Sequence, residues 1–278
     1  MEIAMAVIPM FGTFYLLRGK TALTAAGSCY PNYRGRPVPR SGGLILYFAF
    51  LLAGALRLLG GGEGLLEAAL LLYLAGGFTL LGLVDDFWGD SRHKGFGGHF
   101  RLFLRKGEIS TGLLKALFGG VLALTAAAPL QEGPAALLVG GAVIALAANT
   151  VNSLDLRPGR AVKFFLPASL AVIALSGERG AALLLLPFLA ALLAYMPFEM
   201  QETVMLGDSG ANVLGGALGF AFIAYSPFPW QVGALFLLLA FQAFCELFSF
   251  SRLVQKNPFL RFLDDLGRVF KGENENER

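Results

Sequence analysis

The sequence contains few charged residues and almost no histidine or cysteine. Charged residues make up 15% of its 278 residues, 56% are hydrophobic, and the mean hydropathy is +0.65. A soluble domain would be about one-quarter charged. The apolar residues come in blocks, which indicates a polytopic membrane protein. Cys29 and Cys245 are the only cysteines and have no metal-ligand neighbours, so we interpret both as reduced structural thiols rather than parts of a disulfide scaffold.

The apolar blocks predict an all-α fold, a polytopic membrane helix bundle with about 9–10 transmembrane helices. Several blocks are shorter than the roughly 20 residues of a straight span, which favours tilt or burial inside the bundle. We expect one transmembrane domain over residues 1–270 and a polar, disordered tail over 271–278. The nine blocks lie near 2–17, 43–59, 66–84, 112–128, 135–149, 162–175, 181–197, 210–225 and 230–249.

The basic residues predict the orientation of this bundle. All but two of the 22 lysines and arginines fall on the same side, in alternate loops and the C-terminal tail; the two exceptions are Arg57 and Arg179. An excess of Lys and Arg marks the cytoplasmic face. We therefore expect the N-terminus outside and the C-terminus in the cytoplasm, at the plasma membrane.

Four polar stretches fall on the predicted cytoplasmic face. They are 39–43 (PRSGG), 82–90 (GLVDDFWGD), 149–155 (NTVNSLD) and 206–210 (LGDSG). Because they come from different helix ends, we expect them to form one site that opens to cytosolic substrates.

Asp85 and Asp86 end the third apolar block, and Asp90 follows one helical turn later. One interpretation is that they are solvated loop acids. However, a helix C-terminus carries the negative end of the dipole and disfavours carboxylates unless a cation is bound. Mg²⁺ fits, since it binds one or two carboxylates and completes its octahedron with water and phosphate oxygens.

Asp208 lies in a Gly-Asp-Ser-Gly stretch directly before the eighth block. It could be a simple helix N-cap, because Asp and Ser are preferred there. The N–H groups and dipole of the same helix end also favour anions, so we predict metal or phosphate binding at Asp208.

Asn149, Asn152 and Asp155 recur every three residues at the inner end of the fifth block, which predicts that they share one helix side. They could form helix-to-helix hydrogen bonds or recognise a polar head group. Nearby arginines, among them Arg40, Arg157 and Arg160, could hold a phosphate-bearing substrate.

The chain resembles the polyprenyl-phosphate N-acetylhexosamine-1-phosphate transferases, the family of the phospho-N-acetylmuramoyl-pentapeptide translocase. The resemblance extends from about residue 34 to 267, in order. The stretch 39–43 is similar to the family's Pro-x-x-Gly-Gly, 82–86 to its Asp-Asp motif, 149–155 to its Asn-x-x-Asn-x-x-Asp, and 205–210 to its Gly-Asp-Ser/Val-Gly.

The resemblance implies a bacterial membrane enzyme of cell-envelope glycan synthesis, such as that of peptidoglycan. Such an enzyme transfers a sugar 1-phosphate from a UDP-sugar to a polyprenyl phosphate and releases UMP. By the family pattern, Asp208 binds Mg²⁺, with Asp85 and Asp86 as further candidate ligands. Asp85 or Asp86 activates the lipid phosphate, and Asn152 and Asp155 line the nucleotide-sugar pocket. The expected partners are the membrane, the lipid phosphate, the UDP-sugar and a possible second copy of the chain, with no nucleic acid.

Two positions depart from the family pattern. Asp155 is followed by Leu-Arg-Pro-Gly-Arg instead of Gly-Leu-Asp-Gly-Leu, and the last loop reads Lys256-Asn-Pro-Phe-Leu-Arg261 without histidine. The only histidines, His93 and His99, follow the Asp cluster. A non-catalytic relative that binds a polyprenyl-linked lipid or acts as a scaffold is therefore an alternative. A prenyltransferase would need two aspartate-rich clusters, and a transporter would bind its substrate at the midplane.

Overall fold

A computed structural model describes residues 2–18, 29–40, 42–61, 63–88, 110–177 and 179–268, and the side chains of all of these except 2–6 and 18. Asp90, His93, His99 and the 271–278 tail, on which predictions were made, lie outside the described residues.

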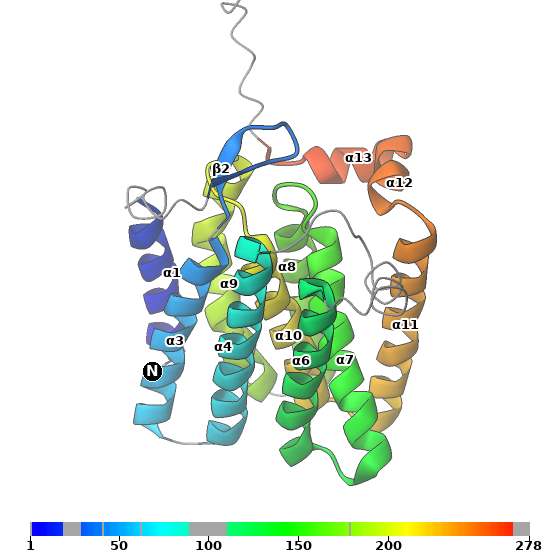
Figure 1. Ribbon diagram of the computed structural model, residues 1–278. Helices are drawn as coiled ribbons and strands as arrows, with labels where there is room; N and C mark the ends of the chain where they lie inside the picture. Colours follow the sequence, from blue (N-terminus) through cyan, green and yellow to red (C-terminus); the bar gives the residue numbers. More distant parts are fainter. Residues whose placement is uncertain are drawn as a thin grey trace, which may run out of the picture.

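Each of the nine predicted apolar blocks corresponds to an α-helix, and the helices run side by side as a bundle (Figure 1). Six of them are long and apolar enough to cross a membrane: α3, α4, α6, α7, α9 and α11. The helical membrane fold predicted from the sequence is thus confirmed. The bundle helices are α1 (Glu2–Arg18), α3 (Gly42–Gly60), α4 (Leu65–Trp88), α6 (Thr111–Ala127), α7 (Gly133–Leu154), α8 (Arg160–Ser176), α9 (Arg179–Met200), α10 (Gly207–Tyr225) and α11 (Phe228–Leu247).

Helix α10 forms the centre of the bundle. Almost all of its residues are buried, and it packs against α3, α4, α7, α8 and α9. Its glycines let neighbouring backbones approach: a Cβ on Gly215 would lie 2.5 Å from Cα of Ala148 in α7. In a bilayer such close van der Waals packing replaces much of the hydrophobic driving force. Helix α11, in contrast, buries only Gln231 among the described residues and lies at the edge of the bundle (Figure 1).

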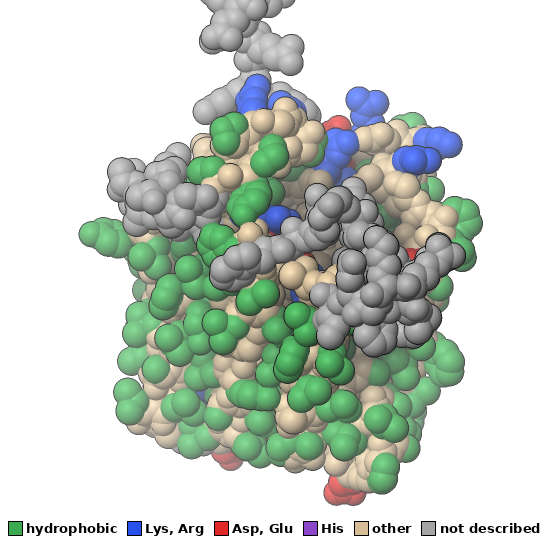
Figure 2. All heavy atoms as spheres, viewed as in Figure 1, with side chains coloured by type: hydrophobic (Ala, Val, Ile, Leu, Met, Phe, Trp, Pro, Cys, Tyr) green, Lys and Arg blue, Asp and Glu red, His purple; other side chains and the backbone are tan. Residues whose placement is uncertain are grey.

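Two further features lie at the same end of the bundle. Strands β1 (Cys29–Pro31) and β2 (Pro37–Pro39) form an antiparallel hairpin, and the short helices α12 (Phe250–Lys256) and α13 (Pro258–Asp265) lie across the helix ends (Figure 1). Apart from these two features, a short 3₁₀ turn, η1 (Ala128–Leu130), follows α6. The hairpin was not predicted from the sequence. In Figure 2 most of the visible Lys and Arg side chains gather at this end, above a belt of hydrophobic side chains.

A network of hydrogen bonds fixes the hairpin. The Asn32 side-chain oxygen accepts the backbone N–H groups of Arg34 (2.9 Å) and Arg36 (3.1 Å), which closes the turn. Glu202, in the connection between α9 and α10, accepts hydrogen bonds from Asn32 and Tyr33 at 3.0 Å each. The hairpin is therefore held against the connection that leads into α10.

Candidate functional site

Three helix ends meet where the motif glycines lie. The N–H groups of Gly42 and Gly43, at the start of α3, donate to the carbonyls of Met205 and Leu206 at 3.0 Å each. A Cβ on Gly82 of α4 would come within 3.0 Å of the backbone of Ser209 in α10. The ends of α3, α4 and α10 can pack this closely only because these positions lack side chains. The glycines thereby bring Arg40, Asp86 and Asp208 together.

Asp86 caps the N-terminus of α10 from a different helix. Its two carboxylate oxygens accept the backbone N–H groups of Asp208 (3.0 Å) and Ser209 (3.1 Å), and the residue is 5% exposed. The Arg40 Nε lies 3.1 Å from the same carboxylate. Gly207 has a φ of +70°, and a side chain there would contact Asp86 and the Arg40 carbonyl. Two N–H groups at this helix end, which we expected to favour an anion such as phosphate, are therefore already paired with the Asp86 carboxylate.

Lys115 of α6 links the other two carboxylates. Its Nζ donates to Asp85 Oδ2 at 2.8 Å and to Asp208 Oδ2. The side chains of Lys115, Asp85 and Asp208 are each about one-fifth exposed, at 19%, 20% and 16%. They therefore remain accessible, whereas Asp86 is enclosed. From the sequence, Lys115 was only one of the basic residues of the predicted cytoplasmic face, and its place between two carboxylates was not predicted.

Arg40 and Asn152 complete the surroundings of Asp208. The Arg40 Nη2 lies 3.7 Å from Asp208 Oδ1, and the guanidinium lies over the Tyr30 ring of the hairpin. The Asn152 amide approaches Asp208 Oδ2 at 3.5 Å. Of the predicted residues, Asp85, Asp86, Asp208, Asn152 and Arg40 thus converge.

Asn149 points elsewhere. Its amide donates to Gln242 Oε1 of α11 at 2.7 Å, and Gln242 donates in turn to Thr150 at 2.9 Å. This is the helix-to-helix hydrogen bond that the sequence left open as an alternative. The expectation that Asn149, Asn152 and Asp155 share one helix side is wrong. Each step of three residues turns the side chain about 60° less than a full helical turn, so two steps move it well away from the first residue's side.

Asp155 lies just past the end of α7, at the C-cap. Burial raises the pKa of this carboxyl well above its usual value, and the nearby Glu199 and Asp208 carboxylates raise the pKa further. A carboxyl with a raised pKa stays protonated to a higher pH than a solvated aspartate does.

The two predicted arginines after Asp155 have different surroundings. The Arg157 guanidinium stacks 4.8 Å from the centre of the Tyr33 ring, beside the hairpin. Arg160 is 7% exposed, makes a two-pronged pair with Asp264 of α13 at 2.8 and 3.0 Å, and donates to Ser251 at 3.1 Å. Arg160 therefore anchors the C-terminal helices, and its predicted role as a phosphate ligand is not supported by these contacts.

The carboxylates can be tested for their fit to a divalent cation. Among the described residues, no cluster of three or more His, Cys, Asp or Glu side chains could enclose a metal ion. Asp85 and Asp208, however, both pair with the ammonium group of Lys115, so both carboxylates face one cation position. Two carboxylates with the remaining ligands from water and phosphate match the preference of Mg²⁺. The donor set fits Mg²⁺ shared with a phosphate substrate.

More than half of the chain matches a known protein family. Residues 68–226 match the model of glycosyl transferase family 4, which covers more than half of the chain. The chain belongs to this family. The matched region runs from α4 to the end of α10 and includes Asp85, Asp86, Lys115, Asn152 and Asp208.

One curated relative agrees with the family assignment. The phospho-N-acetylmuramoyl-pentapeptide-transferase of Desulforamulus reducens is 27% identical over 202 residues. The match covers 65% of this chain and 58% of that protein, so the chain spans less than two-thirds of the relative it matches. Membership in family 4 supports a membrane-embedded enzyme of the glycosyl phosphotransferase type.

Proposed function

We propose that the protein transfers a sugar 1-phosphate, of the N-acetylhexosamine class, from a UDP-sugar to a polyprenyl phosphate and releases UMP. The observation that carries this proposal is the pairing of Lys115 with both Asp85 and Asp208 beside Arg40. This arrangement places two cationic side chains and two accessible carboxylates at one end of a membrane bundle, as transfer between phosphate groups requires.

Lys115 and Arg40 would hold the diphosphate of the donor. Their side chains form ion pairs with Asp85, Asp86 and Asp208. A diphosphate entering the site offers them new oxygen acceptors. Asp208 would hold Mg²⁺, which when bound would supply positive charge to the diphosphate and to the departing UMP.

The two neighbouring aspartates have different tasks in this proposal. Asp86 uses both oxygens to cap α10 and is enclosed. Asp85 is more exposed than Asp86, so we assign to Asp85 the removal of the last proton of the lipid phosphate. An oxygen of that phosphate then attacks the sugar-linked phosphorus, and the bond to the phosphate of UMP breaks.

The surface next to Asp85 suits a lipid acceptor. Val84 and Phe87 of α4 and Leu117 and Phe118 of α6 are exposed apolar residues close in sequence to Asp85 and Lys115. A polyprenyl chain could lie along this surface in the bilayer while its phosphate reaches the carboxylates. The nucleotide-sugar would bind on the side of α7 and the hairpin, through Asn152, Asp155 and Arg157.

A labelled donor tests the transfer. Purified protein is incubated with polyprenyl phosphate, Mg²⁺ and UDP-N-acetylhexosamines that carry ³²P in the phosphate next to the sugar. We expect the label to enter the lipid fraction together with the sugar, and unlabelled UMP to be released in equal amount. Transfer of the sugar without the label would indicate ordinary glycosyl transfer instead. No transfer from any donor would favour the non-catalytic relative.

A further inference from the structure

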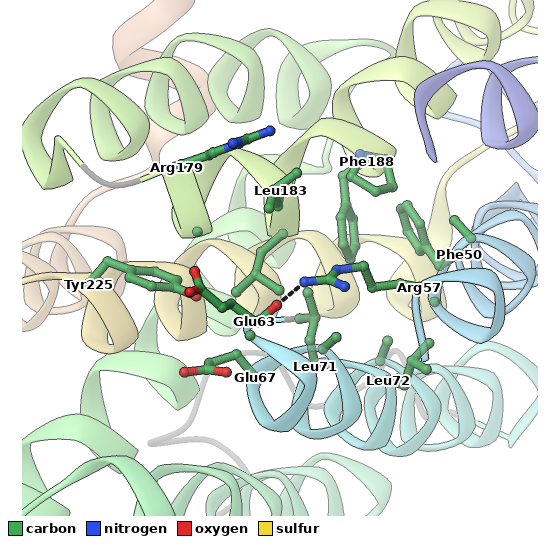
Figure 3. A pocket seen from close by; sticks show the side chains of 18 residues that line it. Phe50, Arg57, Glu63, Glu67, Leu71, Leu72, Arg179, Leu183, Phe188 and Tyr225 are labelled. Carbon is green, nitrogen blue, oxygen red and sulfur yellow. Dashed lines mark hydrogen bonds between the residues drawn. The ribbon is translucent and has the colours of Figure 1, made fainter. Parts of the chain in front are cut away.

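A second site lies at the opposite end of the bundle. A cavity of about 330 Å³ opens between α3, α4, α9 and α10 (Figure 3). Its polar residues Arg57, Glu67 and Tyr225 are at the ends of α3, α4 and α10 that are farthest along each helix from Arg40, Asp85 and Asp208. The volume is within the roughly 300–1,000 Å³ of ligand sites. The cavity is therefore separate from the site proposed for catalysis.

Polar groups of both signs meet at one end of this cavity. Arg57 Nη2, Glu67 Oε2 and Tyr225 OH each lie 3.8 Å from the place where a Cβ would stand on Gly64. Arg57 is only 6% exposed, and its guanidinium is fixed by the carbonyls of Gly61 (2.6 Å) and Glu63. This buried arginine is thus held rigidly at the cavity wall.

Two more charged residues lie at the cavity. Glu63 and Arg179 both line it, and Figure 3 shows Arg179 on α9 across the cavity from Glu67. Together with Arg57 and Glu67 they supply two positive and two negative groups. A lining without net charge, but with both signs present, complements a ligand that also carries both signs.

The rest of the lining is apolar. Leu71 and Leu72 of α4, Leu183 and Phe188 of α9, and Phe50 of α3 also line the cavity (Figure 3), so its lining has an apolar part as well as a charged part. A ligand that fills both parts must have a charged head and a hydrocarbon portion. A free phosphate ion could satisfy an arginine but would leave the apolar wall uncovered.

We propose that this cavity binds the head and upper chains of a zwitterionic phospholipid of the phosphatidylethanolamine class. Arg57, Arg179 and the Tyr225 hydroxyl would bind the phosphate, Glu63 and Glu67 the ammonium group, and the leucine and phenylalanine side chains the acyl chains. The site would tie α3, α4, α9 and α10 together at this end, so that lipid binding stabilises the bundle independently of any transferase activity.

Lipid-dependent thermal stability tests this proposal. The full chain in detergent is titrated with short-chain phosphatidylethanolamine, with phosphatidylglycerol and with water-soluble phosphoethanolamine, and Tm is measured at each concentration. We expect a saturable rise in Tm with phosphatidylethanolamine, at an apparent affinity about tenfold tighter than for phosphatidylglycerol. Phosphoethanolamine should bind far more weakly because it lacks the chains. Equal responses to the two lipids would overturn the proposal.

Variants separate recognition from general stability. The double variant Glu63→Gln with Glu67→Gln should remove the preference for phosphatidylethanolamine, since the ammonium loses both of its partners while the phosphate contacts remain. Arg179→Gln should weaken binding of both lipids, and Leu183→Trp should fill the cavity and abolish both responses. Glu132→Gln, an exposed acid at the same end of the bundle but outside the cavity, serves as the matched control. A preference that survives in the double variant of Glu63 and Glu67, or is lost in Glu132→Gln, would contradict the proposed site.

Discussion

Lys115 is the residue whose environment is most informative. It reaches two carboxylates from different helices, Asp85 of α4 and Asp208 of α10. Asp86, next to Asp85, instead accepts two backbone N–H groups of α10. These contacts support a structural role for Asp86 and the chemical role that we propose for Asp85. Their order in the sequence could not distinguish them, because both match the same motif.

Replacing each aspartate by asparagine should separate the two roles. Asp86→Asn leaves an amide that can accept one N–H group but opposes the other with its NH₂, so we expect a loss of stability of about 1–3 kcal/mol. Asp85→Asn should leave Tm nearly unchanged, since Lys115 keeps Asp208, but should lower kcat about 100-fold or more. Measurements of Tm and of UMP release on both variants check this. The reverse pattern would show that Asp86 is the reactive carboxylate.

At the scale of elements, α12 and α13 are held to the bundle by charge. Arg160 of α8 pairs with Asp264, Arg268 lies 3.1 Å from the same carboxylate, and Lys163 donates to the carbonyls of Leu263 and Asp264 at the end of α13. The sequence predicted no helices after the ninth block. Asn257, in the loop where the family's histidines were expected, caps α13 by accepting the N–H groups of Phe259 and Leu260.

This charge cluster predicts a pH dependence. Burial alone would raise the pKa of Asp264, but Arg160 and Arg268 outweigh burial and hold the pKa below its usual value. The ion pairs therefore stabilise the fold fully above the ordinary aspartate pKa of about 3.9, and this stability is lost as the pH falls through the lower folded pKa. Asp264→Asn should cost about 3 kcal/mol at pH 7.

The measurement is Tm of the wild type and of Asp264→Asn across pH. We expect the difference to be large at neutral pH and to shrink in the acid range. Asp265→Asn is the matched control: its carboxylate is 35% exposed and pairs with the same Arg268, so it should cost no more than about 1 kcal/mol. A difference that stays constant with pH would show that the pairs with Asp264 do not contribute this stability.

Helix positions were easier to predict from the sequence than helix ends and side-chain directions. All nine apolar blocks are helices, but the third block was placed at 66–84 and α4 continues to Trp88, so Asp85 and Asp86 lie on the helix itself. Hydropathy falls where the charges begin, whereas the helix ends only after them, since those charges have partners on α6 and α10. The direction of Asn149 toward α11 depended on packing that no local pattern encodes.

At the scale of the whole molecule, the candidate site exists only because distant segments meet. Arg40 follows the hairpin, Asp85 and Asn152 lie near the ends of α4 and α7, and Lys115 and Asp208 lie near the starts of α6 and α10. Alternating helices predicted that the four motif stretches share one end of the bundle. Lys115 could not be chosen from the many basic residues predicted at that end, because its place between two carboxylates is set by the packing of α4, α6 and α10.

Asp208 receives contacts from most of these segments, through Lys115, Arg40 and Asn152. The most direct test of the proposed chemistry is therefore the rate of UMP release by the wild type and by Asp208→Asn, with a panel of UDP-N-acetylhexosamines, polyprenyl phosphate and either Mg²⁺ or a chelator. Glu132→Gln, at the other end of the bundle, is the control. We expect Mg²⁺-dependent release by the wild type and the control, and a decrease of about 100-fold or more in Asp208→Asn. Release that persists in Asp208→Asn, or in the chelator, would contradict a site built on this carboxylate.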